Sequence, residues 1–221
     1  MKRINIALDG YSGTGKSSTA REVAKALNYT YVDSGAMYRA TTLFFIRNDI
    51  DPRDHSQVVQ ALKEIHLNFD DNEINLNGEN VASEIRTMKV NEMVSHISAI
   101  KEVRQEMVSQ QQEMGHFKGL VMDGRDIGTV VFPEAELKVF MTASADVRAL
   151  RRQKELAEKG IEEELSAIKA NLLERDQIDS NRKESPLVKA EDALELDTSK
   201  LTFETQVGKI VEWAKSRIYE S

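Results

Sequence analysis

The sequence predicts an α/β fold, a P-loop parallel sheet flanked by helices. A glycine-rich phosphate-binding motif stands between a strand pattern and a helix pattern, and short apolar strands alternate with helices along most of the chain. A stretch at about 51–87 instead alternates in period two with DN and NG turn signals, which indicates an antiparallel insertion packed on the main domain. A chain of 221 residues suits one domain with such an insertion.

The glycine-rich stretch GYSGTGKSS at residues 10–18 matches G-x-x-x-x-G-K-[ST] at Gly10, Gly15, Lys16 and Ser17. The strand pattern RINIALD precedes it and the helix pattern STAREVAKAL follows it. Glycine lets successive N–H groups turn inward around an anion, and the helix that begins here points its positive dipole end at the same anion. Lys16 adds a point charge for the β and γ phosphates, and Ser17 offers a hydroxyl to Mg²⁺. The alternative is a flexible turn with a surface lysine, which the flanking strand and helix disfavour.

The elements after this motif follow in order. Residues 29–33 (YTYVD) predict a strand, and residues 34–49 predict a helix with an apolar stripe. A short amphipathic helix at 56–65 precedes the alternating stretch, which predicts antiparallel strands. Two helical stretches come next, at 84–98 and 101–114, and Gly115 is placed to end the second.

The βα rhythm then resumes. Strands are predicted at 119–123 and 137–142, and a helix at 145–159 that Thr142 or Ser144 caps and Gly160 closes. A further helix at 161–178, a strand at 192–197 and a helix at 203–218 complete the chain. Since ligands of open α/β sheets bind outside the carboxyl ends of the strands, polar residues that follow strands are the candidate site residues.

Composition excludes several classes of function. The net charge of −7, from 30 basic and 37 acidic residues, argues against a nucleic-acid partner. The absence of cysteine excludes disulfides and thiolate chemistry, and the four histidines stand too far apart to form a zinc-ligand pair. No run approaches the roughly 18 apolar residues of a membrane helix, and the N-terminus lacks a signal-peptide pattern. We therefore expect a cytoplasmic protein with no membrane partner, and we separately expect a monomer.

A P-loop leaves hydrolysis, signalling and phosphoryl transfer open. The chain has neither the N-K-x-D motif of a GTPase switch nor the LSGGQ motif of ABC-type ATPases. Arginines are frequent at the ends of the predicted elements: Arg39, Arg104, Arg125, Arg148, Arg151, Arg152, Arg175 and Arg182. Because arginines and Mg²⁺ neutralise the charge of a transferring phosphoryl group, transfer is favoured over hydrolysis. For the three arginines at 148–152, a solvated helix face in which Arg151 pairs with Glu155 stays an equal alternative.

Four further blocks resemble the bacterial cytidylate kinases: DSGAMYRA (33–40), EIRT (84–87), DGRDIGTVVFP (123–133) and ERDQIDSNRKESPL (174–187). The resemblance extends from about residue 3 to the C-terminus. It implies a single nucleoside monophosphate kinase domain, with a core at 1–50 and 88–221, an NMP-binding insertion at about 51–87 and a short helical lid at about 148–160. It also implies Mg²⁺-dependent transfer of the γ-phosphoryl group of ATP to CMP or dCMP, which gives ADP and CDP or dCDP.

The resemblance assigns roles to residues by position. The ATP site comprises Gly10, Tyr11, Ser12, Gly13, Thr14, Gly15, Lys16, Ser17 and Ser18. The cytosine site comprises Ser34, Ser95, Arg104, Arg125 and Asp126. Arg39 would hold the acceptor phosphate, and Arg175, Asp179 and Arg182 would reach the sugar. The catalytic residues would be Lys16, Arg125, Arg148, Arg151 and Arg152.

Physical chemistry supports base recognition by Asp126. Its carboxylate can accept from the N4 amino group that cytosine has and uracil lacks, while an arginine donates to O2 and N3. A buried acceptor left unpaired by uracil would discriminate strongly between the two bases. The alternative for Asp126 is a turn or N-cap carboxylate, and the alternative for Arg175 and Asp179 is a plain i, i+4 salt bridge.

Two positions stay open. Asp123 ends an apolar strand as a Walker-B acid does, so we expect it to bind Mg²⁺ with Ser17, directly or through water, although Asp33 ends a neighbouring strand in a similar place. Tyr11 stands where such kinases usually have proline, a departure that concerns the donor base rather than the phosphates. Two rival functions are a kinase for another acceptor such as UMP, and a nucleotide sensor that binds ATP without turnover.

Overall fold

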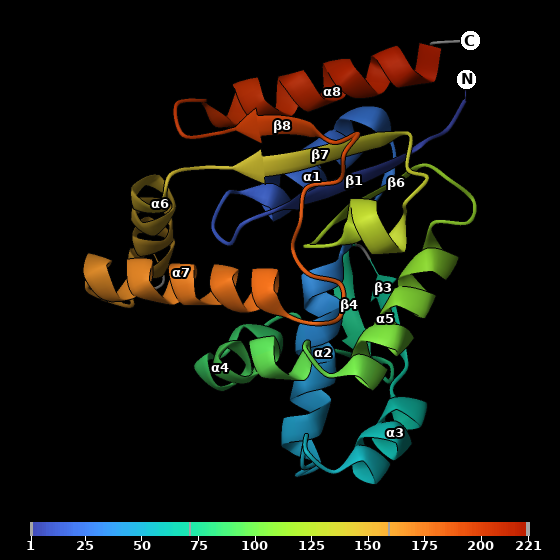
Figure 1. The fold of residues 1–221 in the computed structure, drawn as a ribbon, viewed down its shortest axis with the longest axis vertical. Coiled ribbons are helices and arrows are strands. Elements are labelled where there is room, and N and C mark those ends of the chain that lie inside the picture. Colours follow the sequence, from blue (N-terminus) through green and yellow to red (C-terminus); the bar gives the residue numbers. More distant parts are fainter. Residues whose placement is uncertain (1, 71, 159, 220–221) are drawn as a thin grey trace. The chain divides into compact units, whose positions relative to one another are not determined.

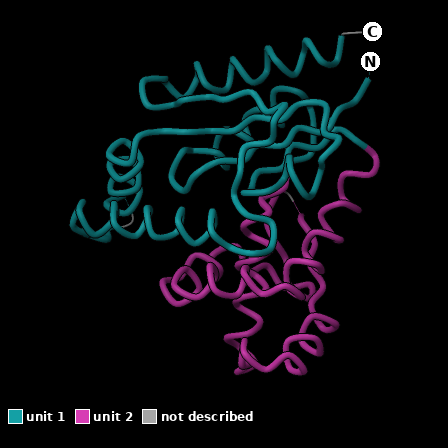
Figure 2. The backbone as a smooth tube through the Cα atoms, viewed as in Figure 1, with its two compact units in different colours: residues 1–31, 118–221 teal, residues 32–117 magenta. Residues whose placement is uncertain are grey.

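A computed structural model describes residues 2–70, 72–158 and 160–219 (Figure 1). The chain forms two compact units (Figure 2). Unit 1 comprises residues 1–31 and 118–221, and unit 2 comprises residues 32–117. Among the described residues, no helix combines the length and the apolar character needed to cross a membrane.

A five-stranded sheet has the strand order β2-β6-β1-β7-β8. Four of its strands lie in unit 1, and β2 begins in unit 1 and ends in unit 2. The strands are β1 (Asn5–Gly10), β2 (Thr30–Asp33), β6 (Leu120–Asp123), β7 (Leu137–Thr142) and β8 (Leu194–Asp197). β1 pairs in parallel with β6 on one side and β7 on the other, and β7 pairs in parallel with β8. The carboxyl ends of these strands therefore lie along one edge of the sheet, as predicted.

The helices of unit 1 are α1 (Lys16–Leu27), α6 (Ala145–Ala157), α7 (Leu165–Asn181) and α8 (Phe203–Tyr219), with one π-helical turn, η2 (Ile127–Val131). One core joins sheet residues such as Ile6 and Leu8 to Val23 of α1 and Ile210 of α8, all of which have no exposed surface. Because burial of such side chains is the main favourable contribution to folding, this core fixes the strand that carries the phosphate loop.

Unit 2 comprises α2 (Ser34–Arg47), α3 (His55–Glu64), β3 (Leu67–Asp70), β4 (Glu73–Leu76), β5 (Glu79–Asn80), the 3₁₀ turn η1 (Glu84–Arg86), α4 (Met88–Ile97) and α5 (Lys101–Met114). Its three strands form an antiparallel sheet in the order β3-β4-β5, in which Leu67 lies opposite Leu76. The predicted antiparallel stretch is therefore confirmed, as is the α/β class of the whole fold.

Two predicted helices have different limits. The helix expected at 84–98 is divided, because Thr87 has extended backbone angles (φ −65°, ψ 158°) between η1 and α4. The helix expected at 161–178 begins at Leu165, because the Ile161 N–H donates to the carbonyl oxygen of Leu156 and so closes α6 instead. The cap that the sequence placed at Ser144 is confirmed by its side-chain bond to the Val147 N–H.

The predicted limits of core, insertion and lid stay predictions. The structure shows only that the antiparallel strands lie in unit 2 and that α6 lies in unit 1. The helix expected at 145–159 and the lid expected at 148–160 both include Lys159, and the insertion includes Asp71. These two positions lie outside the described residues.

Candidate active site

The phosphate loop connects the central strand β1 to α1. Gly10 ends the strand where a Cβ would collide with the carbonyl oxygen of Met141 on β7. Gly15 precedes the helix in the left-handed region, with φ 87°, where a side chain is strained. The motif thus has the strand–loop–helix context that distinguishes a phosphate site from a flexible turn, and two of its glycines are required by the backbone.

Lys16 is buried inside this loop, with 5% of its surface exposed. Its Nζ donates to the Tyr11 carbonyl oxygen at 2.6 Å and to the Thr14 hydroxyl at 3.4 Å. Burial and the positive charge of Arg125 hold the pKa of Lys16 well below its ordinary value, although nearby carboxylates oppose this shift. Anionic phosphates would remove the cost of keeping this ammonium group charged.

The two residues predicted to bind metal are in contact. The Ser17 hydroxyl donates to Asp123 at 2.8 Å, and the Tyr31 hydroxyl donates to the other oxygen of the same carboxylate at 2.8 Å. Asp33, the alternative, instead caps α2 at the Ala36 N–H, 2.8 Å away. One hydroxyl beside one carboxylate fits Mg²⁺, which usually binds to one or two carboxylates together with phosphates and water. Accordingly, the described residues contain no cluster of three or more metal-binding side chains.

Two carboxylates of α7 hold arginines beside the loop. Asp176 pairs with Arg148 of α6. Asp179 accepts from Arg125 at 2.8 Å with one oxygen and from Arg182 at 3.5 Å with the other. Burial alone would lower the pKa of Arg125, but the charge and hydrogen bond of Asp179, together with the charges of Asp176 and Asp123, outweigh burial and raise that pKa. The arrangement keeps several guanidinium groups charged and oriented in a largely buried place.

Arg175, on the same helix, is half-buried. The sequence placed it in a salt bridge with Asp179 or beside the sugar. The two carboxylate oxygens of Asp179 accept hydrogen bonds from Arg125 and Arg182. The predicted contact of Arg175 with the sugar stays a prediction.

Asp126 is 4% exposed and faces Arg182, whose guanidinium is 3.4 Å from its carboxylate. Asp126 immediately precedes η2, but its side chain makes no capping hydrogen bond to that turn. The alternative role of Asp126 as an N-cap is therefore wrong. The turn is held instead by Asp9, which accepts from the N–H groups of Ile127 at 2.8 Å and Gly128 at 2.7 Å. Burial raises the pKa of Asp9 to about 6, although these two N–H groups oppose the shift.

Asp9 and Asp176 are site residues that sequence reasoning missed. For Asp9 there was a signal: a carboxylate next to the first glycine of the motif, at the end of a strand that is buried on both faces. For Asp176 the signal was weaker, since the block ERDQIDSNR contains three acidic residues and no rule of spacing selects the one that faces the loop.

The other arginines of α6 differ in their contacts. Arg151 donates to the Thr198 hydroxyl at 3.0 Å, to the Thr198 carbonyl oxygen at 2.7 Å and to the Thr14 carbonyl oxygen at 3.4 Å. Arg152 donates to Glu155 at 3.2 Å, and 38% of its side chain is exposed. The alternative in which Glu155 pairs with Arg151 on a solvated helix face is wrong, because Arg151 binds Thr198 and Thr14 while Glu155 binds Arg152.

The predicted site residues of unit 2 lie on three helices. Ser34 begins α2 and is buried, and Arg39 one turn later donates to Asp33 at 2.9 Å. Arg104 of α5 is buried with its guanidinium 5.3 Å from the centre of the Tyr38 ring. It also donates to the Ser98 carbonyl oxygen at 3.2 Å. The Ser98 hydroxyl in turn donates to the carbonyl oxygen of Ser95, which links these two predicted residues.

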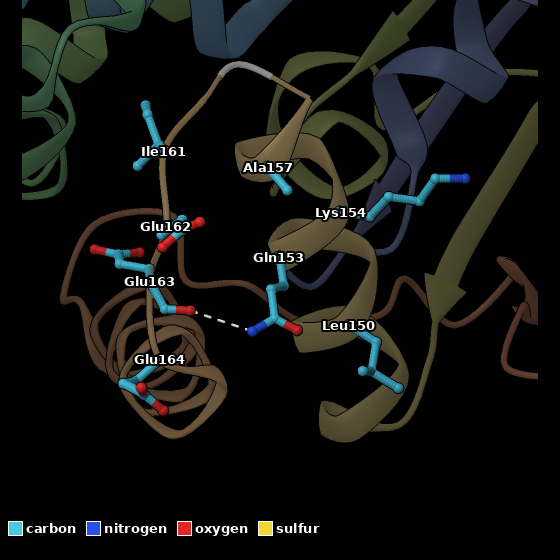
Figure 3. A pocket seen from close by; sticks show the side chains of 8 residues that line it. All are labelled: Leu150, Gln153, Lys154, Ala157, Ile161, Glu162, Glu163 and Glu164. Atoms are coloured by element: carbon cyan, nitrogen blue, oxygen red, sulfur yellow. Dashed lines mark hydrogen bonds between the residues drawn. The ribbon is translucent and has the colours of Figure 1, made fainter.

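Figure 3 shows a separate pocket of about 650 Å³ between α6 and the segment before α7. It is lined by Leu150, Gln153, Lys154, Ala157, Ile161, Glu162, Glu163 and Glu164. Its size would accept a nucleotide, but its lining residues include three glutamates and one lysine, and this excess of negative charge repels phosphates. The candidate nucleotide site is therefore the phosphate loop and its arginines rather than this pocket.

Comparison with known proteins identifies the family. The family described as "Cytidylate kinase" matches residues 6–216, which include the loop and all the arginines described above. The chain belongs to the cytidylate kinase family. A cytidylate kinase of Flavobacterium johnsoniae is 50% identical over 96% of this chain and 96% of its own length. A cytidylate kinase of Bacteroides fragilis is 53% identical over 93% of this chain and 94% of its own length.

Solved structures agree on the fold. A shikimate kinase from Bacteroides thetaiotaomicron matches with a TM-score of 0.50 at 13% identity, over 97% of this chain and 99% of its own. An uncharacterized protein from Eubacterium ventriosum matches with a TM-score of 0.54 at 11% identity, also over 97% and 99%. Identities this low show the fold alone. They place this member of the cytidylate kinase family among P-loop kinase folds.

Proposed function

We propose that the chain transfers the γ-phosphoryl group of ATP to CMP or dCMP, giving ADP and CDP or dCDP, as a step of pyrimidine nucleotide metabolism. The main support is its membership of the cytidylate kinase family over residues 6–216. The contacts of unit 1 agree with this reaction, because a phosphate loop, a strand-end carboxylate and several arginines stand together. Phosphoryl transfer depends on positioning and charge neutralisation, which is what such a set supplies.

For the donor, we propose that the loop at residues 10–18 binds the phosphates of ATP. Lys16 would exchange its bond to the Tyr11 carbonyl oxygen for the β and γ phosphates. Ser17 and Asp123 would hold Mg²⁺, which when bound neutralises phosphate charge. The contact between these two side chains supports that pairing.

For the acceptor base, Asp126 is the residue we propose to recognise N4 of cytosine, with Arg125 beside it. Ser34, Ser95 and Arg104 of unit 2 are proposed to complete the recognition of the base. Burial of Asp126 supports the assignment, because an acceptor that water cannot reach penalises a base without an N4 donor.

For the rest of the acceptor, Arg39 is proposed to hold the phosphate, and Arg175, Asp179 and Arg182 the sugar. The attacking atom is an oxygen of the acceptor phosphate, which needs no general base. Of the three arginines of α6, Arg152 has 38% of its side chain exposed and pairs with a surface glutamate, whereas Arg148 and Arg151 donate to the loop. We assign Arg152 to the transferred group directly, and closure of the segment at 148–160 to the exclusion of water.

Steady-state kinetics with ATP and equal concentrations of CMP, dCMP and UMP test this function. The expected result is rapid turnover of CMP or dCMP and slow turnover of UMP. Equal rates for UMP and CMP would overturn the cytosine assignment, and ATP binding without turnover would indicate a sensor. The proposed cytoplasmic monomer, in which one chain supplies every residue named above, is tested by its mass in solution.

A further inference from the structure

Ser12, in the phosphate loop, has all of its polar groups bound to charged side chains. Its N–H donates to one oxygen of Asp176 at 2.9 Å, and its carbonyl oxygen accepts from Arg148 at 2.9 Å. Its hydroxyl accepts from Arg125, also at 2.9 Å. The N–H of Ser12 is therefore bound to a carboxylate, and Ser12 ties the loop to α6 and α7.

The two groups that hold the Ser12 backbone also bind each other. The guanidinium of Arg148 donates to the second oxygen of Asp176, and its Nε donates to the carbonyl oxygen of Ala143 at 3.1 Å. Asp176 is 7% exposed and Arg148 is 5% exposed. Charge-assisted bonds in so dry a place are strong and restrict orientation. Ser12, Arg148 and Asp176 therefore form a closed triangle of polar contacts.

The ring of Tyr11 packs against the Arg148 corner of this triangle. The Arg148 guanidinium lies 5.5 Å from the centre of the Tyr11 ring, a cation–π distance. The same ring packs edge-on against Phe140 of β7, with their centres 5.7 Å apart. The carbonyl oxygen of Tyr11 accepts from Lys16, so the arginine and the lysine are held by the ring and the backbone of one residue.

We propose that Asp176 and Arg148 are positioning residues that clamp the phosphate loop at Ser12 and hold it in the conformation that binds ATP. The inference rests on the proposed function only in taking this loop as the ATP site. A loop held in its bound conformation loses less entropy when the ligand binds, so the clamp should act on ATP affinity. The two ends of the loop are already fixed by β1 and α1. The clamp adds a third point of attachment at Ser12, held by α6 and α7.

A second ion pair between the same two helices supplies the control. Asp146 of α6 and Lys169 of α7 are 2.7 Å apart, but their side chains are 73% and 40% exposed and the bond joins the helices without reaching the loop. If Asp176 serves only to hold α7 to α6, the two pairs differ only in their contribution to stability. If it clamps the loop, only its own replacement changes ATP affinity.

The experiment compares Asp176→Asn with Asp146→Asn by calorimetric titration with Mg-ATP alone and with CMP alone. Asp176→Asn keeps the shape of the side chain but removes the charge that orients Arg148. We expect Mg-ATP binding about tenfold weaker, the effect of losing roughly one charge-assisted hydrogen bond, with CMP binding changed less than about twofold. Asp146→Asn should bind both ligands as the unaltered protein does. Because direct binding is measured, the result does not depend on which acceptor is phosphorylated.

Arg148→Lys provides a second variant if Asp176→Asn fails to fold. It keeps a positive charge opposite Asp176, but an ammonium group cannot reach Asp176, Ser12 and Ala143 together. Weaker Mg-ATP binding with unchanged CMP binding is again expected. In the double variant Arg148→Lys, Asp176→Asn, the loss should be no greater than in either single variant. Unchanged Mg-ATP affinity in Asp176→Asn and Arg148→Lys would overturn the proposal, as would equal losses for both nucleotides.

Discussion

Two arginine–carboxylate networks in this chain use the same chemistry in different surroundings. In unit 1, the side chains of Arg182 and Asp126 are 6% and 5% exposed. In unit 2, Arg47 binds Glu79 and Glu84 at 2.8 Å each, but Glu79 is 57% exposed. The shortest bonds of the two networks are similar in length, since Arg125 and Asp179 of unit 1 are also 2.8 Å apart, so the networks differ in burial. Geometry and energetic consequence are therefore separate properties of an ion pair.

The difference follows from the dielectric surroundings. Exposed ion pairs contribute about 0–1 kcal/mol because water screens them. A buried pair contributes little net stability either, but removal of one partner leaves an unpaired charge that costs several kcal/mol. The buried network of unit 1 is therefore the sensitive one, although the bonds of unit 2 are as short as the Arg125–Asp179 bond. The predictions below test this contrast.

Lys16→Ala should have the largest effect. The substitution removes a buried cation that the loop holds for phosphates, so turnover should fall by roughly three orders of magnitude or more. The fold should persist, because Lys16 binds only to its own loop in the contacts described. Steady-state kinetics and circular dichroism check both statements. Retained turnover would show that residues 10–18 are not the donor site.

Asp9→Asn should change how stability depends on pH. The pKa of Asp9 is about 6 in the fold, against 3.8 for the free side chain. The folded protein therefore holds this proton more tightly, so stability from this group is fully present below pH 3.8 and is lost as pH rises through 6. Relative to the unaltered protein, Asp9→Asn should gain about 3 kcal/mol of unfolding free energy between pH 4 and pH 7.

Urea unfolding across that pH range measures the difference. Asp192→Asn is a matched control of opposite sign, because a hydrogen bond from Lys138 lowers the pKa of Asp192. Its stabilising effect is present above the ordinary pKa and is lost in acid, so this variant should lose relative stability as pH rises. Parallel curves for Asp9→Asn and the unaltered protein would contradict the buried-charge explanation.

Asp126→Ala should reduce the preference for CMP over UMP by roughly 10–100-fold, the range expected for one good polar contact with a base. The reason is that a buried acceptor without a partner penalises uracil, and alanine removes that penalty. The ratio of kcat/KM for the two acceptors is the measurement. An unaltered ratio would remove Asp126 from base recognition.

Arg47→Ala should have the smallest effect. Loss of its bonds to Glu79 and Glu84 should lower the unfolding free energy by about 1 kcal/mol or less, because all three side chains are substantially exposed. Kinetic constants should not change. If urea unfolding showed that Arg47→Ala lowers the unfolding free energy by several kcal/mol, the proposed difference between the exposed and the buried network would be wrong.

Local patterns allowed most elements to be predicted. The βα rhythm identified the parallel sheet, and the period-two stretch identified the antiparallel strands, because both depend on residues near one another in sequence. The exceptions have local causes that periodicity does not register. The extended backbone of Thr87 separates η1 from α4. The Ile161 N–H bonds to the Leu156 carbonyl oxygen at the end of α6, so Ile161 does not begin the next helix. The π-helical turn η2 was missed because Asp9, far away in sequence, holds it.

The sequence indicated which residues belong to the candidate site, but it did not indicate which side chains bind one another there. The motif and the resemblance identified Lys16, Ser17 and Asp123, and the structure brings the last two into contact. Pairing between helices was not accessible, since the partner of Arg148 lies 28 positions away in the chain. The i, i+4 spacing on α6 allowed a salt bridge between Arg151 and Glu155. In the structure Arg151 instead donates to the Thr198 carbonyl oxygen, and Glu155 accepts from Arg152.

The central place of β1 has a consequence for dynamics. Its backbone is hydrogen-bonded to a neighbouring strand on each side, at Leu120–Asp123 and at Leu137–Met141. Amide protons of Ile6, Ala7 and Leu8 should therefore exchange with deuterium only when the whole of unit 1 unfolds. We therefore expect the phosphate loop to follow one of the slowest-exchanging strands of its unit, so that local opening elsewhere need not disturb the donor site.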